Sequence, residues 1–213
     1  MKEIIHKYQK EYENSNGCFW ERAPAKYVSL FIKNYKLDFS KITILDLGAG
    51  EGKNSVFLAN HVANVIAVDI SEIALARFSL QPNYNSCKSR ITIVKDDIRN
   101  ISFHNNQFDV IVAYGILHCL NSKEEVLAII DKIEKWLKKG GYFICATFTN
   151  TIPVPEIQSY LEENAFLSEG ELEKYLTKFT IIESENSILT ETHPTSKIEH
   201  QHSIVRVIAK KNG

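Results

Sequence analysis

The chain of 213 residues holds 25 basic and 26 acidic side chains, a formal net charge of −1, and 44% of its residues are hydrophobic. This length suits one large domain with a well-buried core. The balanced charge lacks the basic signature of a nucleic-acid-binding protein, and nothing in it favours an anionic membrane as partner.

Strand-like and helix-like patterns alternate along the chain. Two amphipathic helices are predicted before the first strand, over residues 2–13 and 23–36. Further helices are predicted near 53–60, 71–79, 122–138 and 168–177, and strands near 42–47, 64–69, 91–95, 108–114, 141–149, 178–186 and 202–210. The alternation predicts a single α/β domain with a doubly wound, mostly parallel seven-stranded sheet and helices on both faces. Because no helix separates the last two strands, they should form a C-terminal antiparallel hairpin.

A glycine-rich turn follows the first predicted strand. Asp46 ends the apolar run, and Gly48, Gly50 and Gly52 then fall at every second position before a helix-like pattern begins. Glycines let the chain turn tightly and bring bare backbone against a ligand. The next apolar run ends in Asp69, at the distance expected of a ribose-binding acid in a nucleotide-binding unit. The pattern predicts a Rossmann-like nucleotide site.

The spacing of this turn separates two classes of cofactor. A dinucleotide fingerprint needs a third glycine, and Lys53 occupies that position. Asp46 would oppose a pyrophosphate, whereas it suits a ligand that carries an ammonium group. An adenosine ligand with a cationic amino-acid tail, such as S-adenosylmethionine, therefore fits better. A nicotinamide-dependent oxidoreductase with a Rossmann-type site and a non-catalytic S-adenosylmethionine-binding module remain the alternatives.

From about Ile42 to Phe148 the chain resembles the seven-stranded S-adenosylmethionine-dependent methyltransferases. The resemblance implies that the glycine loop holds the methionine part of the cofactor and that Asp69 accepts both ribose hydroxyls. It also implies that Asp97 and Ile98 bind adenine, in preference to Asp96, because an apolar residue follows Asp97. The complete cofactor set expected on this basis is Trp20, Arg22, Asp46, Gly48, Gly50, Asn54, Asp69, Ile70, Asp97, Ile98 and Tyr114.

The segments outside this core should complete the pocket. Trp20 is either a lid over the cofactor or a core anchor for the first helices, and Arg22 would pair with the cofactor carboxylate. The insert at 149–168 resembles a mobile loop over the acceptor site, and its prolines favour an extended segment. The expected division is 1–40 for N-terminal helices and lid, 41–149 for the cofactor core, and 150–213 for the acceptor side.

Four histidines should converge at the carboxyl edge of the sheet. They are His118 after the fourth strand, His193 and His200 in a hairpin loop expected over 187–201, and His202 just inside the last strand. Three interpretations are open: solvated surface side chains, contacts with the substrate, or a metal site. The surface interpretation is the simplest, so no metal ligand is assigned. His118 is the one histidine expected at the catalytic position.

Two further segments resemble the tellurite-resistance branch of the family, namely 51–55 in the glycine loop and 166–176 with 206–211 in the C-terminal half. The histidine-rich hairpin has no match there, so the acceptor atom stays open. The expected activity is methyl transfer from S-adenosylmethionine to a small molecule by in-line displacement. A dedicated base is optional for such a reaction.

The remaining expectations concern location and assembly. No apolar run reaches membrane-spanning length, and the first residues lack the apolar segment of a signal peptide. The four cysteines at 18, 87, 119 and 145 show neither a C-x-x-C pair nor a disulfide spacing. We therefore expect a cytoplasmic monomer or homodimer that binds neither nucleic acid nor membrane.

Overall fold

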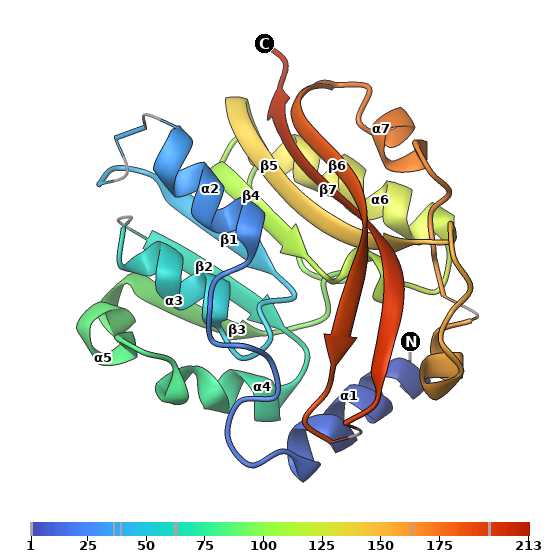
Figure 1. Ribbon diagram of the computed structural model, residues 1–213. Coiled ribbons are helices and arrows are strands. Elements are labelled where there is room, and N and C mark those ends of the chain that lie inside the picture. Colours follow the sequence, from blue (N-terminus) through green and yellow to red (C-terminus); the bar gives the residue numbers. More distant parts are fainter. Residues whose placement is uncertain (1, 36, 39, 62–63, 163, 196) are drawn as a thin grey trace.

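Seven strands form one sheet in the order β3-β2-β1-β4-β5-β7-β6 (Figure 1). The computed structural model describes residues 2–35, 37–38, 40–61, 64–162, 164–195 and 197–213. All strand pairs are parallel except those of β7, which is antiparallel to both β5 and β6. The strands are β1 Thr43–Leu47, β2 Asn64–Asp69, β3 Ile91–Lys95, β4 Phe108–Tyr114, β5 Leu137–Thr149, β6 Phe179–Thr192 and β7 Glu199–Lys211.

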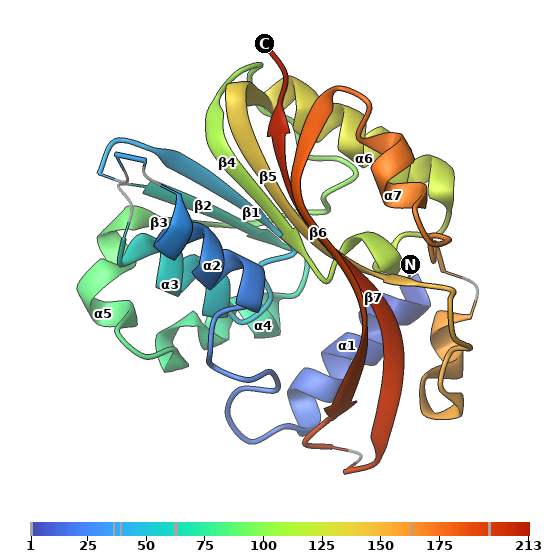
Figure 2. The same ribbon diagram turned by 45° about the horizontal axis from the view of Figure 1, so that its top comes forward.

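Helices cover both faces of this sheet (Figures 1 and 2). Helices α2 and α3 lie on one face, and α6 and α7 lie on the other, whereas α1 crosses beside the tip of the β6–β7 hairpin. Within the described ranges, every helix is too short or too polar to cross a membrane. The α-helices are α1 Lys2–Asn14, α2 Lys26–Asn34, α3 Lys53–Ala59, α4 Glu72–Ala76, α5 Tyr84–Cys87, α6 Lys123–Trp136 and α7 Glu171–Tyr175, and the 3₁₀ helices are η1 Arg77–Leu80, η2 Lys88–Arg90, η3 Leu117–Cys119 and η4 Glu156–Leu161.

Each face of the sheet has its own hydrophobic core. Alternate residues of a strand point to opposite faces, and the central strands are apolar on both. Leu45 and Ile111 pack with Ile130 of α6 on one side, whereas Ile44 and Val112 pack on the side of α2 and α3. This two-sided burial explains the near-continuous apolar runs, and it holds the carboxyl ends of the strands in fixed positions.

The chain direction creates a crevice at those carboxyl ends. From β1 the chain winds outward through β2 to β3, and it then returns to β4 on the other side of β1. In open α/β sheets a ligand binds where the strand order reverses in this way. Asp109, at the opposite end of β4, accepts hydrogen bonds from Thr43 N and Lys138 Nζ (both 2.9 Å) and therefore ties strands together away from the crevice.

Several boundaries differ from those expected. Strand β6 continues to Thr192 and β7 begins at Glu199, so the predicted loop over 187–201 is wrong and only 193–198 connects the strands. The polar residues of β6 alternate strictly between half-buried and exposed positions, as in an edge strand. Residues 153–155 are non-helical as expected, but the insert then forms η4. Strand β5 begins at Leu137 and not near 141, so Gly140 and Gly141 lie inside it, at a register shift against β4.

Candidate functional site

A cavity of about 260 Å³ lies at the carboxyl edge, between the glycine loop, α1 and the β6–β7 hairpin. Helix α1 contributes Ile5, Tyr8 and Tyr12, which share one helix face because they are spaced by three and four residues. The amphipathic pattern of α1 did not predict that this helix would line the cavity. Ten of the twelve expected site residues line the cavity: Trp20, Gly48, Gly50, Asn54, Asp69, Ile70, Asp97, Ile98, Tyr114 and His118.

Two glycines of the loop have no room for a side chain. Gly48 has φ +70°, and a Cβ there would lie 2.6 Å from Cβ of Ile116. Gly52 has φ +85°, and its Cβ would lie 2.6 Å from the ring of Phe78. Both residues need glycine for the left-handed backbone as well as for the close packing. The loop is thus held tightly between the segments after β4 and α4, with its backbone facing the cavity.

Asp69 fixes the loop from the end of β2. Its Oδ2 accepts from Gly50 N and its Oδ1 from Ser71 N, both at 2.8 Å. Burial raises the pKa of this carboxyl, although these backbone amides oppose the shift. A carboxylate has about four lone-pair sites, so each oxygen keeps one acceptor position for a hydroxyl. The geometry therefore accommodates a ribose and also gives Asp69 a structural task.

Asp46 lies beneath the loop and does not line the cavity. It is 1% exposed, and its Oδ2 accepts a hydrogen bond of 2.5 Å from Ser55 Oγ. Burial raises the pKa of Asp46 to about 7, against the lowering effect of Ser55. The structure thus places this residue behind the loop, where its carboxyl holds Ser55 of α3.

The two acids after β3 differ in what they bind. Arg99 holds the Asp97 carboxylate with Nε at 3.0 Å from both oxygens and Nη2 at 2.5 Å from Oδ2. Burial would raise the pKa of Asp97, but the bonds from Arg99 outweigh it and the pKa is lowered. Asp96 also lines the cavity, and its Oδ1 accepts from Asp97 N at 2.7 Å. Both acids therefore line the cavity, together with Ile98.

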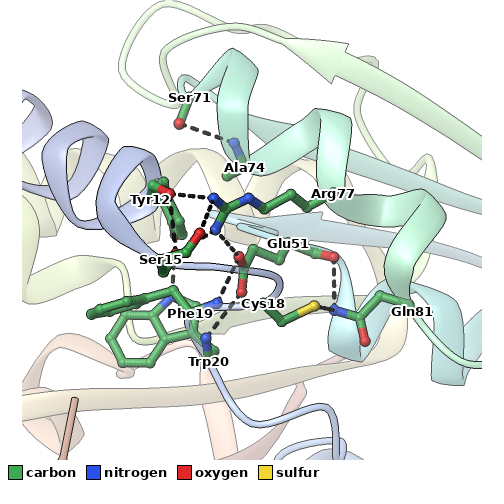
Figure 3. Close-up of polar contacts among 10 residues, drawn as sticks. All are labelled: Tyr12, Ser15, Cys18, Phe19, Trp20, Glu51, Ser71, Ala74, Arg77 and Gln81. Carbon is green, nitrogen blue, oxygen red and sulfur yellow. Dashed lines mark hydrogen bonds and ion pairs between the residues drawn. The ribbon is translucent and has the colours of Figure 1, made fainter. Parts of the chain in front are cut away.

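A buried carboxylate anchors the N-terminal segment across the glycine loop (Figure 3). Glu51 is 2% exposed and accepts from Phe19 N (2.9 Å) and Trp20 N (3.0 Å). Arg77 Nη1 donates to Glu51 Oε1 at 2.9 Å and to Ser15 Oγ at 2.7 Å. We call these five residues the Glu51 clamp. Sequence reasoning missed it, although the position of Glu51 within the glycine loop was a signal.

Trp20 both lines the cavity and packs against the N-terminal segment. Its ring lines the cavity, and its Nε1 donates to the Tyr12 hydroxyl at 3.1 Å. It also packs against Phe19, with ring centroids 4.8 Å apart. Arg22, by contrast, is exposed and does not line the cavity. Lys53 does line it, and burial lowers the pKa of its ammonium group.

Three of the four histidines are buried around the hairpin, so the interpretation as a solvated surface loop is wrong for them. His193, His200 and His202 are only 9%, 7% and 2% exposed. Phe148 stacks on His202 and on His118, with centroids 4.1 Å apart in both pairs. The expected convergence of the four histidines is therefore present.

His118 is a neutral side chain at the wall of the cavity. It is 2% exposed, and burial lowers its pKa to about 3. Its Nδ1 accepts from Phe148 N at 3.4 Å, which assigns the proton of the neutral ring to Nε2. In this tautomer Nε2 is a hydrogen-bond donor, not a proton acceptor.

Comparisons with known proteins agree with this site. A family model described as a methyltransferase domain matches residues 44–141. The probable S-adenosyl-L-methionine-dependent methyltransferase TehB of Haemophilus influenzae is 28% identical over 178 residues, which cover 81% of this chain and 59% of TehB. That match reaches beyond the family-model segment into the C-terminal half, where the sequence resembles the tellurite-resistance branch.

Solved structures share the fold over nearly the whole chain. The 1,6-didemethyltoxoflavin-N1-methyltransferase of Burkholderia thailandensis superposes with a TM-score of 0.72 at 18% identity, covering 99% of this chain and 88% of that one. The N-methyltransferase NodS of Bradyrhizobium japonicum gives 0.70 at 14% identity, covering 98% and 99%. The chain spans 20–59% of the length of the curated relatives that it matches. The methyltransferase-domain match, the sequence similarity to TehB and the shared fold together show that this chain is similar to the seven-stranded S-adenosylmethionine-dependent methyltransferases.

Proposed function

We propose that this chain transfers a methyl group from S-adenosylmethionine to a small-molecule acceptor. The observation that carries the proposal is that the glycine loop, Asp69 and the Asp97–Ile98 pair all line one cavity at the carboxyl edge of the sheet. When bound, the cofactor supplies a sulfonium methyl group that is already activated toward displacement. The protein then has to align the acceptor and exclude water, which contributes roughly 7–11 kcal/mol in favourable intramolecular cases.

The proposed cofactor contacts follow the lining of the cavity. Asp69 offers one free acceptor position on each oxygen to the ribose hydroxyls. Ile70 and Ile98 supply apolar surface for the adenine ring, beside the acids that follow β3. Lys53, not Arg22, is proposed as partner of the cofactor carboxylate, because Lys53 lines the cavity. Trp20 closes the site as a lid that the Glu51 clamp holds in place.

The acceptor end of the cavity is largely apolar. Ile116, Phe148, Leu189 and Ile204 line it, with His118 among them. Such a lining favours a small, largely apolar molecule with one nucleophilic heteroatom. A chalcogen oxyanion is less suited, because Glu191 also lines this region and a carboxylate opposes an anion. The 1,6-didemethyltoxoflavin-N1-methyltransferase, which shares the fold, has a small molecule, 1,6-didemethyltoxoflavin, bound together with S-adenosylhomocysteine.

His118 is proposed to position the acceptor. A pKa of about 3 makes the ring a poor general base at neutral pH, since an effective base titrates near the working pH. The Nε2 proton instead suits a hydrogen bond to a lone pair of the acceptor. The chemistry then needs an acceptor whose nucleophilic atom arrives with a free lone pair. His118→Ala should lower turnover and leave cofactor affinity largely unchanged.

We further propose the same division of the chain into three regions that the sequence predicts. Residues 1–40 form the lid, 41–149 bind the cofactor, and 150–213 form the acceptor side, to which η4 and the hairpin contribute Gln158, Leu189 and Glu191. A cytoplasmic setting is proposed because all four cysteines are free thiols. No nucleic-acid substrate is proposed, since basic and acidic residues balance, and a monomer or homodimer would suffice for the site.

Calorimetry with S-adenosylmethionine, S-adenosylhomocysteine and NADH tests the cofactor assignment. We expect micromolar binding of the first two and none of NADH. Binding of NADH alone would replace the proposal with an oxidoreductase. Methyl transfer is then measured as S-adenosylhomocysteine formation with a panel of small amines, phenols and thiols. Cofactor binding without turnover on any acceptor would favour the non-catalytic module.

A further inference from the structure

A cluster of metal-ligating side chains lies on one face of the β6–β7 hairpin. Side chains alternate along a strand, so Leu189 and Glu191 of β6 share a face with His200 and His202 of β7. The strand register places Glu191 directly opposite His200, and Leu189 opposite His202. Cross-strand partners and their diagonal neighbours are close enough for direct contact. The hairpin itself therefore brings one carboxylate and two imidazoles together.

The donor atoms of this cluster face one another. One oxygen of Glu191, Oε1, lies 3.6 Å from His200 Nε2 and 3.5 Å from His202 Nε2. The three ligand atoms all lie within 4.8 Å of one another. Within the described part of the chain, neither Nε2 atom has a hydrogen-bond partner, although both are buried. Such buried polar atoms without partners are rare and call for an explanation.

The tautomer of His200 is already that of a metal ligand. Its Nδ1 lies 2.9 Å from the carbonyl oxygen of Ile198, and a carbonyl can only accept. The proton is therefore on Nδ1, and the Nε2 lone pair points toward Glu191. Metal-bound histidines commonly donate the other ring N–H to a carbonyl in this way, which fixes the ring and its tautomer.

We propose that Glu191, His200 and His202 bind a divalent transition metal ion, with Zn²⁺ the best match to the donor set. Two imidazoles and one carboxylate are an established zinc set, and three protein ligands leave a fourth position for water or a substrate atom. His193 lies beside the cluster, with Nε2 3.6 Å from the same Glu191 oxygen. His193 Nε2 already accepts a hydrogen bond from Gln158 Nε2 at 2.9 Å, so His193 is not included among the proposed metal ligands.

Burial supports this assignment. His200 and His202 are 7% and 2% exposed, so a bound ion would give their buried Nε2 atoms the partner that they lack. A cation would also compensate the half-buried carboxylate of Glu191, which lies between them. Glu191 also lines the cavity, whereas Phe148 stacks between His202 and the cavity residue His118. The ion would therefore lie at the acceptor end of the site.

Metal binding is tested on the full chain with any affinity tag removed. The purified protein is stripped with a chelator, and Zn²⁺ is then titrated in competition with a chromophoric chelator. Co²⁺ serves as a second probe, because its visible absorption reports four-coordinate geometry. The same titrations are carried out on His200→Ala, His202→Ala and Glu191→Gln. His61→Ala and His104→Ala are the matched controls, since both histidines are exposed and far along the chain from the hairpin.

The expected result is one equivalent of Zn²⁺ bound at micromolar or lower Kd, with a rise in Tm on loading. The three cluster variants should bind at least ~100-fold more weakly, and the two controls should bind as the native chain does. Fewer than one equivalent, or equal binding by native chain and cluster variants, overturns the proposal. S-adenosylhomocysteine binding is measured on every variant, so a failed metal site is distinguishable from a failed cofactor site and from a failed fold.

Discussion

Replacing Glu51 by glutamine tests whether the Glu51 clamp holds the lid over the cofactor cavity. The side chain is 2% exposed, and it accepts from two backbone amides and from Arg77. Glutamine keeps the volume, but it removes the charge and turns one acceptor oxygen into a donor. That NH₂ group would face a backbone N–H of Phe19 or Trp20, so at least one buried donor loses its partner.

The expected loss of stability follows from these contacts. Removing one partner of a buried ion pair costs about 3–5 kcal/mol, because the other charge is left uncompensated. Arg77 keeps some compensation here, since it also donates to Ser15 Oγ, Ser15 O and Tyr12 O, and its side chain is 14% exposed. We therefore expect Glu51→Gln to lower the free energy of unfolding by about 2–4 kcal/mol.

Urea denaturation and calorimetry with S-adenosylhomocysteine provide the two measurements. If the clamp keeps the lid closed, affinity should fall in proportion to the closed fraction, by roughly tenfold or more. Glu72→Gln is the matched control, because the Glu72–Lys95 pair is exposed, and it should change neither quantity measurably. Native-like stability of Glu51→Gln would refute the reasoning, and lost stability with unchanged affinity would refute the lid.

Three further substitutions test the cofactor site. Asp69→Ala should weaken S-adenosylhomocysteine binding by about 2–4 kcal/mol. It should also lower the urea midpoint, because two backbone amides lose their acceptor, and full stability would contradict this structural task. Burial raises the pKa of Asp46 to about 7 in the folded chain, against about 4 in the unfolded chain. The stability that this raised pKa contributes is fully present below about pH 4 and is lost as the pH rises through 7. Asp46→Asn should therefore reduce, by on the order of a few kcal/mol, the fall in stability of the cofactor-free protein between pH 4 and 7, and parallel pH curves would exclude this cause. Lys53→Met should weaken binding of S-adenosylhomocysteine but not of methylthioadenosine, which lacks the carboxylate, whereas Arg22→Met should change neither.

The sequence predicted the central fold because its signals there are local. The strand, glycine turn and helix from β1 to α3 lie within one short segment, and each obeys a periodicity that can be read without neighbours. Asp69 ends β2 and Asp97 follows β3 in the same parallel sheet, so their arrival at one edge follows from topology alone. The side chains that line this part of the cavity could therefore be predicted before any contact was known.

The Glu51 clamp and the full length of the hairpin strands could not be predicted in the same way. Glu51 meets residues 26 to 32 positions away, and no periodic pattern links them. The half-buried face of edge strand β6 carries Glu183, Glu185 and Glu191, so its sequence is polar enough to resemble a loop, and the strand was predicted too short. Arg22 was chosen for its charge, whereas the path of the chain turns it to solvent and leaves Lys53 at the cavity.

His193 links the Glu51 clamp to the β6–β7 hairpin. Its ring stacks on Phe19 (5.1 Å between centroids), meets the edge of Trp20 (5.3 Å), and lies 4.9 Å from the ring of His200. Gln158 of η4 donates a hydrogen bond to Nε2 of His193. A closely packed cluster cannot move one ring without displacing the others. The proposed lid and the hairpin face that carries the proposed metal ligands are therefore parts of one wall, so a change in either should reach the acceptor end of the cavity through this histidine.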